Sequence, residues 1–299
     1  MTSKKHGAEA SLEGQVAVIT GGSGGIGRAS AEMWLERGGL VVCADIDVQS
    51  GEAFAAQHPA GKVRFVRVDT RERQDVLRAI EVAQSMGRFS CMFNNAGVGA
   101  VTDTIEEALD NWETMLKVDE INIRACCLGT LLALRAFSPE HGGCVVTTAS
   151  MAGLLPTGAP PMYSMSKAAN VHFTRAVASA LGDASNVRVH ALCPSYTATK
   201  MGPAPQQIQA ALGGVLTARH QAEGFMMLAT ERGALPNGSV MRVTARRGGR
   251  LVVHDLVTYG RELGGTEEAR PGRVLKEAPL EAYTGPMDTS SGRLDLSKL

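Results

Sequence analysis

The sequence has no net charge, because its 30 Lys and Arg residues match its 30 Asp and Glu residues over 299 positions. It therefore lacks the global field that draws a protein to nucleic acid or to an anionic membrane surface. Long apolar runs are also missing: the longest, at residues 125–137, is too short to span a bilayer, and residues 1–11 hold no apolar stretch of a secretory signal. These absences favour an intracellular protein that acts on small molecules, with no nucleic-acid partner and no membrane span.

None of the six cysteines belongs to a C-x-x-C pair or stands at a zinc-ligand spacing from a histidine. They lie inside apolar runs, which predicts buried thiols in a reducing compartment and no metal site. The last three residues, Ser297-Lys298-Leu299, match the peroxisomal import tripeptide. We therefore expect a cytoplasmic protein or, if the source is eukaryotic, a peroxisomal one that is recognised by the import receptor.

Short apolar runs alternate with helical patterns along most of the chain. The runs that predict strands are residues 15–20, 40–45, 63–69, 91–97, 143–150, 187–194 and 239–246, and helical spacing is found at 26–39, 72–87 and 223–231. Most of these strands are apolar on both faces, as is typical of a parallel sheet covered by helices on each side. The pattern predicts the α/β class, with one doubly wound Rossmann-type domain and about seven parallel strands.

The two ends of the chain lack this alternation of apolar runs and helical patterns. We expect a flexible N-terminal arm at residues 1–13, the Rossmann-type domain at 14–260 and an irregular C-terminal tail at 261–299. Within the domain, a segment at about 200–224 combines apolar residues with glycine pairs and few charges. This composition indicates a mobile lid over an apolar substrate.

The loop at residues 20–27, TGGSGGIG, follows the first expected strand and opens the next helix. Backbone N–H groups and the positive helix end converge there, where a pyrophosphate binds in dinucleotide-binding folds. Asp45 ends the second expected strand, where a carboxylate can accept hydrogen bonds from both ribose hydroxyls and would repel a 2′-phosphate. Because Ile46 and Asp47 follow rather than an arginine, NAD is favoured over NADP. The alternative role for Asp45 is a helix cap before residues 48–54.

The glycine spacing T-G-x-x-x-G-x-G and later motifs resemble the short-chain dehydrogenase/reductase family over about residues 14–201. The later motifs are Asp69-Thr70 after the third strand, NNAG at 94–97, Ser150 with Tyr163 and Lys167, and CPSYTAT at 193–199. The resemblance implies a dinucleotide site formed by Gly21, Ser23, Gly25, Ile26, Gly27, Asp45, Ile46, Asp69, Thr70, Asn95, Ala96, Gly97, Tyr163, Lys167, Pro194, Thr197 and Thr199. It also implies an oxidoreductase acting on CH–OH groups.

Tyr163 precedes Lys167 by one helical turn, a spacing that many surface pairs share. Unit charges about 4 Å apart at an effective dielectric of about 20 interact by roughly 4 kcal/mol. Lys167 is therefore expected to lower the pKa of the Tyr163 phenol from about 10 toward neutrality, so that Tyr163 can act as acid and base. By the resemblance, Ser150 holds the substrate oxygen and Lys167 also holds the ribose hydroxyls.

The resemblance further implies an Asn that completes a proton relay, and here the chain departs from the pattern. Counting forward from Trp112 gives Asp119, whereas counting back from the fifth strand gives Asn122. The downstream match is longer and leaves an insertion of about three residues at 118–120, which an irregular turn of the helix could absorb. We therefore assign the relay position to Asn122 and keep Asp119 as the alternative. Ser195 also replaces the family's usual glycine.

The substrate is expected to contact Ser150, Pro160 and Tyr163. Segments 193–199 and 235–244 are similar to the hydroxyprostaglandin dehydrogenase branch of the family, which oxidises secondary alcohols on lipids with NAD, although Pro160 replaces a polar substrate-contacting residue of that branch. The resulting hypothesis is NAD-dependent oxidation of a secondary alcohol on a hydrophobic, lipid-like molecule, or the reverse ketone reduction. The alternatives are an NADP-linked carbonyl reductase and a catalytically silent dinucleotide-binding sensor or scaffold. The resemblance also implies a homodimer or homotetramer.

Overall fold

The computed structural model describes residues 11–99, 105–156, 159–182, 185–199, 216–231, 235–246, 250–256 and 273–279. Most of the expected N-terminal arm, lid and C-terminal tail lies outside these residues, as does the tripeptide Ser297-Lys298-Leu299. Within the described part of the chain, no helix combines the length and the apolar character that a membrane crossing needs.

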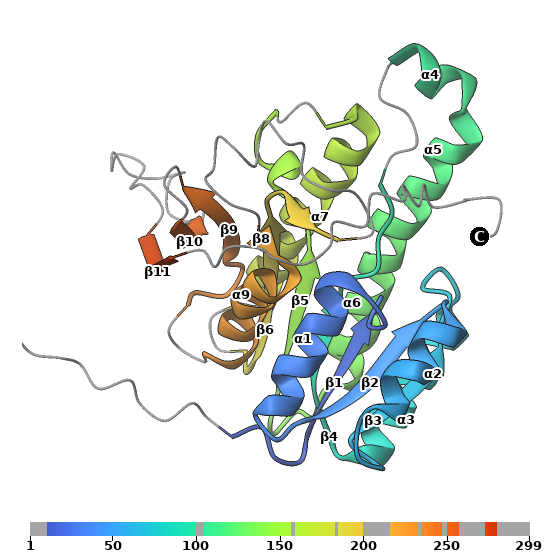
Figure 1. Cartoon of the computed structure of the whole chain (residues 1–299), viewed down its shortest axis with the longest axis vertical. Coiled ribbons are helices and arrows are strands. Elements are labelled where there is room, and N and C mark those ends of the chain that lie inside the picture. The colour runs from blue at the N-terminus through green and yellow to red at the C-terminus, as the bar shows by residue number, and fades with distance from the viewer. Residues whose placement is uncertain are drawn as a thin grey trace, which may run out of the picture.

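One nine-stranded sheet forms the centre of the fold, in the order β11-β10-β9-β6-β5-β4-β1-β2-β3 (Figure 1). Its strands are β1 (Gln15–Thr20), β2 (Leu40–Asp45), β3 (Val63–Arg67), β4 (Arg88–Asn94), β5 (Gly143–Thr148), β6 (Val187–Pro194), β9 (Val240–Arg246), β10 (Arg250–Leu256) and β11 (Arg273–Pro279). The seven strands from β3 to β9 pair in parallel. The predicted doubly wound Rossmann-type architecture is thus confirmed.

Helices cover both faces of this sheet. They are α1 (Gly25–Glu36), α2 (Val48–Ala56), α3 (Arg73–Met86), α4 (Ile105–Asp110), α5 (Trp112–Asp119), α6 (Ala125–Ala136), α7 (Pro161–Leu181) and α9 (Ala218–Thr230), with a π-helix η1 (Glu120–Arg124) and a 3₁₀-helix η2 (Met151–Gly153). Two short strands, β7 (Thr197–Ala198) and β8 (Leu216–Thr217), pair outside the main sheet. Helices α1, α2 and α9 pack on one face, and α3, α6 and α7 on the other.

The alternation of side chains along each strand builds two cores. In β1, Val16 and Val18 belong to the cluster beneath α3, α6 and α7, whereas Ala17 and Ile19 belong to the cluster beneath α1 and α9. All four side chains are fully buried, because a central parallel strand is covered on both faces. This explains why the strands read as continuous apolar runs rather than as alternating ones.

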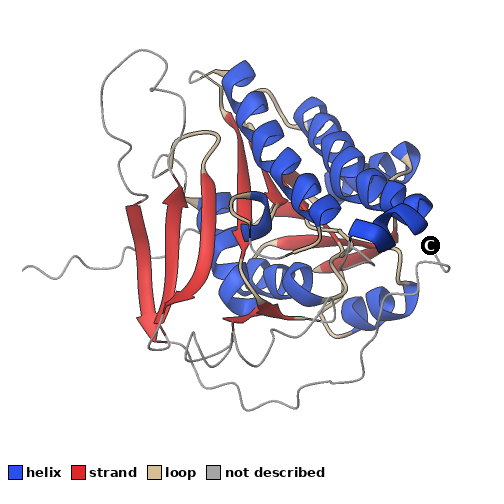
Figure 2. Ribbon diagram, turned by 90° about the horizontal axis from the view of Figure 1, so that it is seen from above, coloured by secondary structure: helices blue, strands red, loops and turns tan. Residues whose placement is uncertain are grey.

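The sheet continues past the parallel part. Strands β10 and β11 add to β9 in antiparallel order, and they lie side by side at one edge of the sheet (Figure 2). The sequence predicted an irregular tail from residue 261, whereas residues 273–279 form β11. The segment carries little alternation of its own and gains its extended structure from the ladder with β10, a non-local pairing that sequence periodicity does not reveal.

Candidate active site

The carboxyl ends of the parallel strands lie at one edge of the sheet, so the residues that follow β1, β2, β4, β5 and β6 gather there. In open α/β sheets, ligands bind in the crevice outside these ends. The predicted site residues are distributed over these connections and over the helices α1 and α7 that begin at the same edge.

The glycine loop makes the tight turn that its sequence predicts. Gly21 and Gly25 have φ of 62° and 50°, values that favour glycine. A Cβ on Gly27 would lie 2.2 Å from the carbonyl oxygen of Gly21, so a side chain at this position would block the close approach of helix and loop. Ile26 packs partly buried against the core beneath the loop.

The N-terminus of α1 is open to an anion. Its cap residue, Gly24, offers no side-chain hydrogen bond, and the first turn of the helix contains no acidic residue. The N–H groups there have no intrahelical acceptors and carry the positive end of the helix dipole. A dinucleotide pyrophosphate fits both the charge and the space that the glycines leave.

Asn95 connects the glycine loop to the neighbouring strands. Its Nδ2 donates to the carbonyl oxygens of Thr20 and Gly21, at 3.1 and 3.3 Å, and its Oδ1 accepts from the Thr148 hydroxyl at 3.1 Å. The backbone N–H groups of Asn95 and Ala96 both donate to the Thr20 hydroxyl. The NNAG segment thereby holds the loop in place against β4 and β5.

Asp45 faces the same loop from the end of β2. Its Oδ2 accepts from the backbone N–H of Ser23 at 3.0 Å and from the Ser23 hydroxyl at 2.6 Å. The cap of α2 is the neighbouring Asp47, whose side chain accepts from the N–H of Ser50. The alternative reading of Asp45 as the helix cap is therefore excluded. Ile46, which lies between Asp45 and Asp47 in the chain, is 37% exposed.

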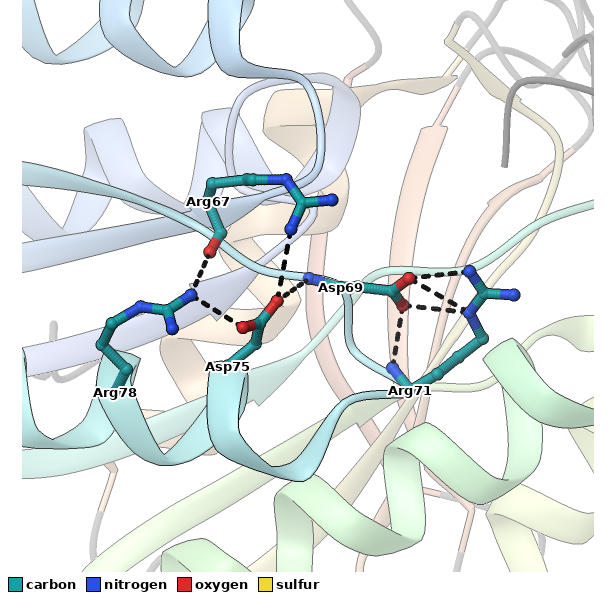
Figure 3. A network of polar contacts seen from close by, with 5 residues as sticks. All are labelled: Arg67, Asp69, Arg71, Asp75 and Arg78. Atoms are coloured by element: carbon teal, nitrogen blue, oxygen red, sulfur yellow. Dashed lines mark hydrogen bonds and ion pairs between the residues drawn. The ribbon is translucent and has the colours of Figure 1, made fainter.

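Asp69 forms a bidentate ion pair with Arg71 (Figure 3). The Nη2 and Nε atoms of Arg71 lie 2.7 and 3.0 Å from the two carboxylate oxygens, and these hydrogen bonds hold the pKa of the Asp69 carboxyl below its ordinary value. The backbone N–H of Asp69 donates to Asp75, and this bond lowers the pKa of Asp75, aided by Arg78. Thr70 lines a small cavity beneath this corner. The negative charge of Asp69, the carboxylate expected near the adenine, is thus already balanced by Arg71.

Tyr163 and Lys167 lie on one side of α7. The Lys167 Nζ lies 5.7 Å from the centre of the Tyr163 ring and donates to the carbonyl oxygen of Thr148 at 2.9 Å. Lys167 is only 3% exposed, and an ammonium has three donors, so two remain for other acceptors. The Tyr163 hydroxyl has no hydrogen-bond partner among the described residues.

Ser150 follows β5 and caps η2. Its Oγ accepts from the backbone N–H of Ala152 at 3.2 Å. A hydroxyl that accepts keeps its own proton for donation. Ser150 is therefore fixed in position and can still donate to a substrate oxygen. Pro160, the other residue predicted to contact substrate, precedes α7 directly and occupies its N-cap position.

Asn122 lies in η1, a π-helical turn between α5 and α6. The irregular turn that the insertion at 118–120 predicted is therefore present. Asn122 is fully buried; its Oδ1 accepts from Val98 N, and its Nδ2 donates to Val98 O and to the Ser166 hydroxyl. Asp119 instead pairs with the exposed Arg124 at 2.8 Å.

Gly97 shows that the Asn122 and Lys167 side chains converge. A Cβ at Gly97 would lie 3.1 Å from Asn122 Oδ1 and 3.4 Å from Lys167 Nζ. The wide turn of the π-helix thus directs Asn122 toward the lysine, while Asp119 stays at the surface. The structure brings together the residues predicted for the relay.

The segment after β6 closes the far side of the glycine loop. A Cβ on Gly25 would lie 3.6 Å from the Thr199 methyl group, so Thr199 stands against the loop. The Thr197 hydroxyl donates to the Ser195 carbonyl at 2.8 Å. No described non-glycine residue has a positive φ, so Ser195, which follows Pro194, needs no glycine-only conformation.

Several residues of the site carried no sequence signal. Ser166 accepts a hydrogen bond from Asn122, and the Thr148 carbonyl accepts one from Lys167. Arg71 donates to Asp69. Only this last pair could have been expected from the sequence, because the two residues are two positions apart. Among the described residues, no group of three or more His, Cys, Asp or Glu is arranged to hold a metal ion.

Comparisons with known proteins agree with this geometry. The model of the family described as short chain dehydrogenase matches residues 15–209. The chain is 32% identical to meso-2,3-butanediol dehydrogenase of Serratia marcescens, covering 76% of this chain and 92% of that protein. It is also 32% identical to 15-hydroxyprostaglandin dehydrogenase [NAD(+)] of Mus musculus, covering 79% and 92%.

Solved structures show the same architecture. The 3-ketoacyl-(acyl-carrier-protein) reductase of Brucella melitensis complexed with NADH superposes with a TM-score of 0.71 at 26% identity, covering 78% of this chain and 97% of that one. The NADPH-dependent 3-quinuclidinone reductase of Rhodotorula rubra gives a TM-score of 0.69 at 26% identity, covering 81% and 95%. Similar folds thus serve both nicotinamide cofactors.

Proposed function

The chain belongs to the short-chain dehydrogenase family, and from this premise we propose that it oxidises a secondary alcohol on a hydrophobic, lipid-like substrate with NAD, or reduces the corresponding ketone. Family membership makes it an oxidoreductase of alcohols or ketones that uses a nicotinamide dinucleotide. One observation carries the proposed acid–base chemistry: the buried Lys167 ammonium lies beside the Tyr163 ring, while the Tyr163 hydroxyl has no partner among the described residues.

Each residue of the site has a distinct task in this reaction. Tyr163 takes the proton of the alcohol, or returns it to the ketone oxygen in reverse. Lys167 stabilises the phenolate by its charge and has donors left for a ribose. Ser150 donates to the substrate oxygen and steadies the charge that develops there. Asn122, next to Lys167, orders the path by which the proton reaches solvent. A bound nicotinamide ring supplies the chemistry these residues lack, by accepting or giving a hydride.

Asp45 supports NAD rather than NADP. Its carboxylate is fixed by Ser23 at the position where ribose hydroxyls are expected, and a 2′-phosphate would meet a like charge there. The adjacent Gly24 has open space around a hypothetical Cβ and brings no cationic side chain. The hydroxyprostaglandin relative is named for NAD(+), while one structural neighbour is NADPH-dependent. An NADP-linked carbonyl reductase is therefore the second candidate.

The substrate class is argued from the segment after Ser150 and from the relatives. Pro160, at the N-cap of α7 three residues before Tyr163, brings no polar side chain to this end of the helix. One relative is named for butanediol and another for hydroxyprostaglandin, two alcohols of very different size. The apolar Pro160 favours the larger, lipid-like class.

We also propose that two copies of the chain pair through α5, α6 and α7. Trp112, Leu116, Leu131 and Met165 on these helices are 53, 40, 56 and 47% exposed. An open groove of about 350 Å³ runs beside Met165, between α7 and the segment after η2. Apolar side chains gathered on neighbouring helices are typical of an interface between subunits. Analytical ultracentrifugation should show a dimer or tetramer that Met165→Lys weakens.

The function is tested with a panel of hydroxy lipids and aromatic secondary alcohols, offered with NAD and with NADP. We expect NADH fluorescence to rise with at least one hydrophobic alcohol and NAD. Turnover only with NADP would establish the carbonyl reductase. Tight NAD binding without turnover on any substrate would leave the dinucleotide-binding sensor. Location is tested separately, by comparing the intact chain with one that lacks Ser297-Lys298-Leu299 in a eukaryotic cell.

A further inference from the structure

Gln221 is a polar side chain that no part of the proposed chemistry uses. It lies in the first turns of α9 and is completely buried. Its Nε2 donates to the Thr197 hydroxyl at 2.9 Å and, less closely, to the carbonyl oxygen of Val243 at 3.4 Å. These contacts join α9 to β7 and to β9.

The direction of these hydrogen bonds is determined by the number of protons available. The Thr197 hydroxyl has one proton, which it donates to the Ser195 carbonyl at 2.8 Å, so its oxygen must accept from Gln221. The Val243 carbonyl can also only accept. The amide nitrogen of Gln221 therefore faces β7, and Oε1 points away from it, without a hydrogen-bond partner in the described part of the chain.

Burial of a glutamine with one unpaired oxygen is costly, and an apolar side chain of the same size would fill the position without this cost. The hydrogen bond to Thr197 must therefore contribute something other than packing. The closest hydrogen-bond partner of the Gln221 side chain in the described part of the chain, at 2.9 Å, lies in β7, so the position of β7 is the property on which Gln221 can act.

Strand β7 is short, and it borders the expected cofactor site. It consists of Thr197 and Ala198, and its partner among the described strands is the equally short β8. One residue further along, Thr199 stands against Gly25 of the glycine loop. A shift of β7 would therefore move Thr199 relative to the loop that is expected to hold the dinucleotide.

We propose that Gln221 is a positioning residue that holds β7, and with it Thr199, against the glycine loop in the geometry that binds the nicotinamide dinucleotide. The inference rests on the proposed function, because it assumes that the dinucleotide occupies this edge of the sheet. Gln221 acts through Thr197 and touches no reacting atom.

The test is Gln221→Met, which nearly keeps the side-chain volume and removes both the amide nitrogen and the amide oxygen. The Kd for NADH, measured by fluorescence titration of the full chain, should rise about fivefold, as expected for the loss of one buried hydrogen bond. KM for NAD should rise with it, while kcat at saturating NAD changes less. The thermal midpoint should not fall, since the unpaired Oε1 is also removed. An unchanged Kd for NADH overturns the proposal.

Two further variants separate positioning from general stability. Thr197→Val removes the hydroxyl that accepts from Gln221. The double variant Gln221→Met/Thr197→Val should bind NADH as tightly as whichever single variant has the higher Kd. Additive losses of affinity would contradict action through Thr197. If Gln221→Met does not fold, Gln221→Leu takes its place, because Thr197 is itself expected to contact the dinucleotide and Thr197→Val alone cannot separate the two roles; an unchanged Kd for NADH overturns the proposal.

Thr230→Val, at the other end of α9, is the matched control. It removes hydrogen bonds to Met226 and Arg37. We expect its Kd for NADH to equal that of the wild type, and an equal rise would show a general effect of α9 and overturn the proposal. If the wild type itself binds no NADH, the proposed function fails together with this inference. If the wild type binds and Gln221→Met binds equally well, only this inference fails.

Discussion

The two ends of the expected cofactor site hold their side chains in different ways. After β2 and β3, the carboxylates are paired with polar groups that donate to them: Asp45 with the N–H and hydroxyl of Ser23, and Asp69 with the Arg71 guanidinium. Around β5 and α7, Lys167 and Ser150 are anchored to backbone groups, and the Tyr163 hydroxyl has no partner among the described residues. The anchored side chains keep protons that they can donate to a ligand, whereas the paired carboxylates can only accept.

The difference predicts where substitutions act on rate and where they act on affinity. At the anchored end, loss of one group should remove a proton-transfer step while leaving dinucleotide binding nearly intact. At the paired end, the same kind of change should alter which dinucleotide binds and how tightly. The variants below test this division from the largest expected effect to the smallest.

Tyr163→Phe should lower kcat about a thousandfold, because it removes the only proton that the proposed chemistry transfers directly, and general acid–base catalysis contributes roughly 10²- to 10⁴-fold. The Kd for NADH should change less than about twofold, since a phenylalanine keeps the ring beside Lys167. Steady-state kinetics and fluorescence titration measure the two quantities. Ser164→Ala, one residue along α7, should leave both unchanged. Retention of turnover in Tyr163→Phe would remove Tyr163 from the mechanism.

Asp45→Ala should weaken NAD binding by roughly 10- to 150-fold, the equivalent of about 1.5–3 kcal/mol for a charged hydrogen bond, and should improve the use of NADP. The ratio of kcat/KM for the two cofactors is the measurement. Asp47→Ala is the control, because it removes the neighbouring carboxylate that caps α2. It should cost about 1 kcal/mol of stability and leave the cofactor ratio as it is. An unchanged ratio in Asp45→Ala would instead support the NADP-linked reductase.

Asn122→Asp should lower kcat about tenfold and stability by about 1–3 kcal/mol. A carboxylate cannot donate to Val98 O or to the Ser166 hydroxyl, so two buried acceptors lose their donor. Asp119→Asn breaks only the surface pair with Arg124 and should cost less than about 1 kcal/mol, with kcat unchanged. A larger loss of kcat in Asp119→Asn than in Asn122→Asp would transfer the relay to Asp119.

The sequence predicts local features of this fold better than contacts between distant elements. Strand β6 occupies the predicted residues 187–194, because its run of apolar and β-branched residues favours extended structure locally. Helix α9 was expected at 223–231 but begins at Ala218, since its capping box uses His220 in place of the usual Glu or Gln. The insertion at 118–120 indicated an irregular turn in this helix, but not its π-helical form or its position at Glu120–Arg124.

The site follows the same rule. The spacing of Tyr163 and Lys167 is visible in the chain, because four residues make one helical turn. The bond between Gln221 and Thr197 is not, since its partners belong to different elements and meet only when α9 packs beside β7. Sequence motifs thus identify groups that perform chemistry, while the residues that position them depend on tertiary packing.

The paired end and the strand beside the anchored end should also differ in their response to acid. At the paired end, hydrogen bonds lower the pKa of Asp69 and Asp75, so their stabilising effect is present above the ordinary carboxyl value and is lost only as pH falls below about 4. On β6, which pairs with β5, burial lowers the pKa of His190 from 6.5 to about 3. Because the unfolded chain then takes up a proton that the folded chain refuses, stability is lost as soon as pH falls below about 6.5.

The wild type should therefore lose about 2 kcal/mol of stability between pH 7 and pH 5 through His190. This figure depends little on the folded-state pKa, because pH 5 lies well above it. His190→Leu should abolish that part of the loss, since the ring is buried and neither ring nitrogen has a partner among the described residues. Urea unfolding at both pH values measures it, with the exposed His172→Gln as control. An equal loss of stability in His190→Leu would show that another group is acid-sensitive. A loss of stability confined to below pH 4 would instead indicate the carboxylates of Asp69 and Asp75.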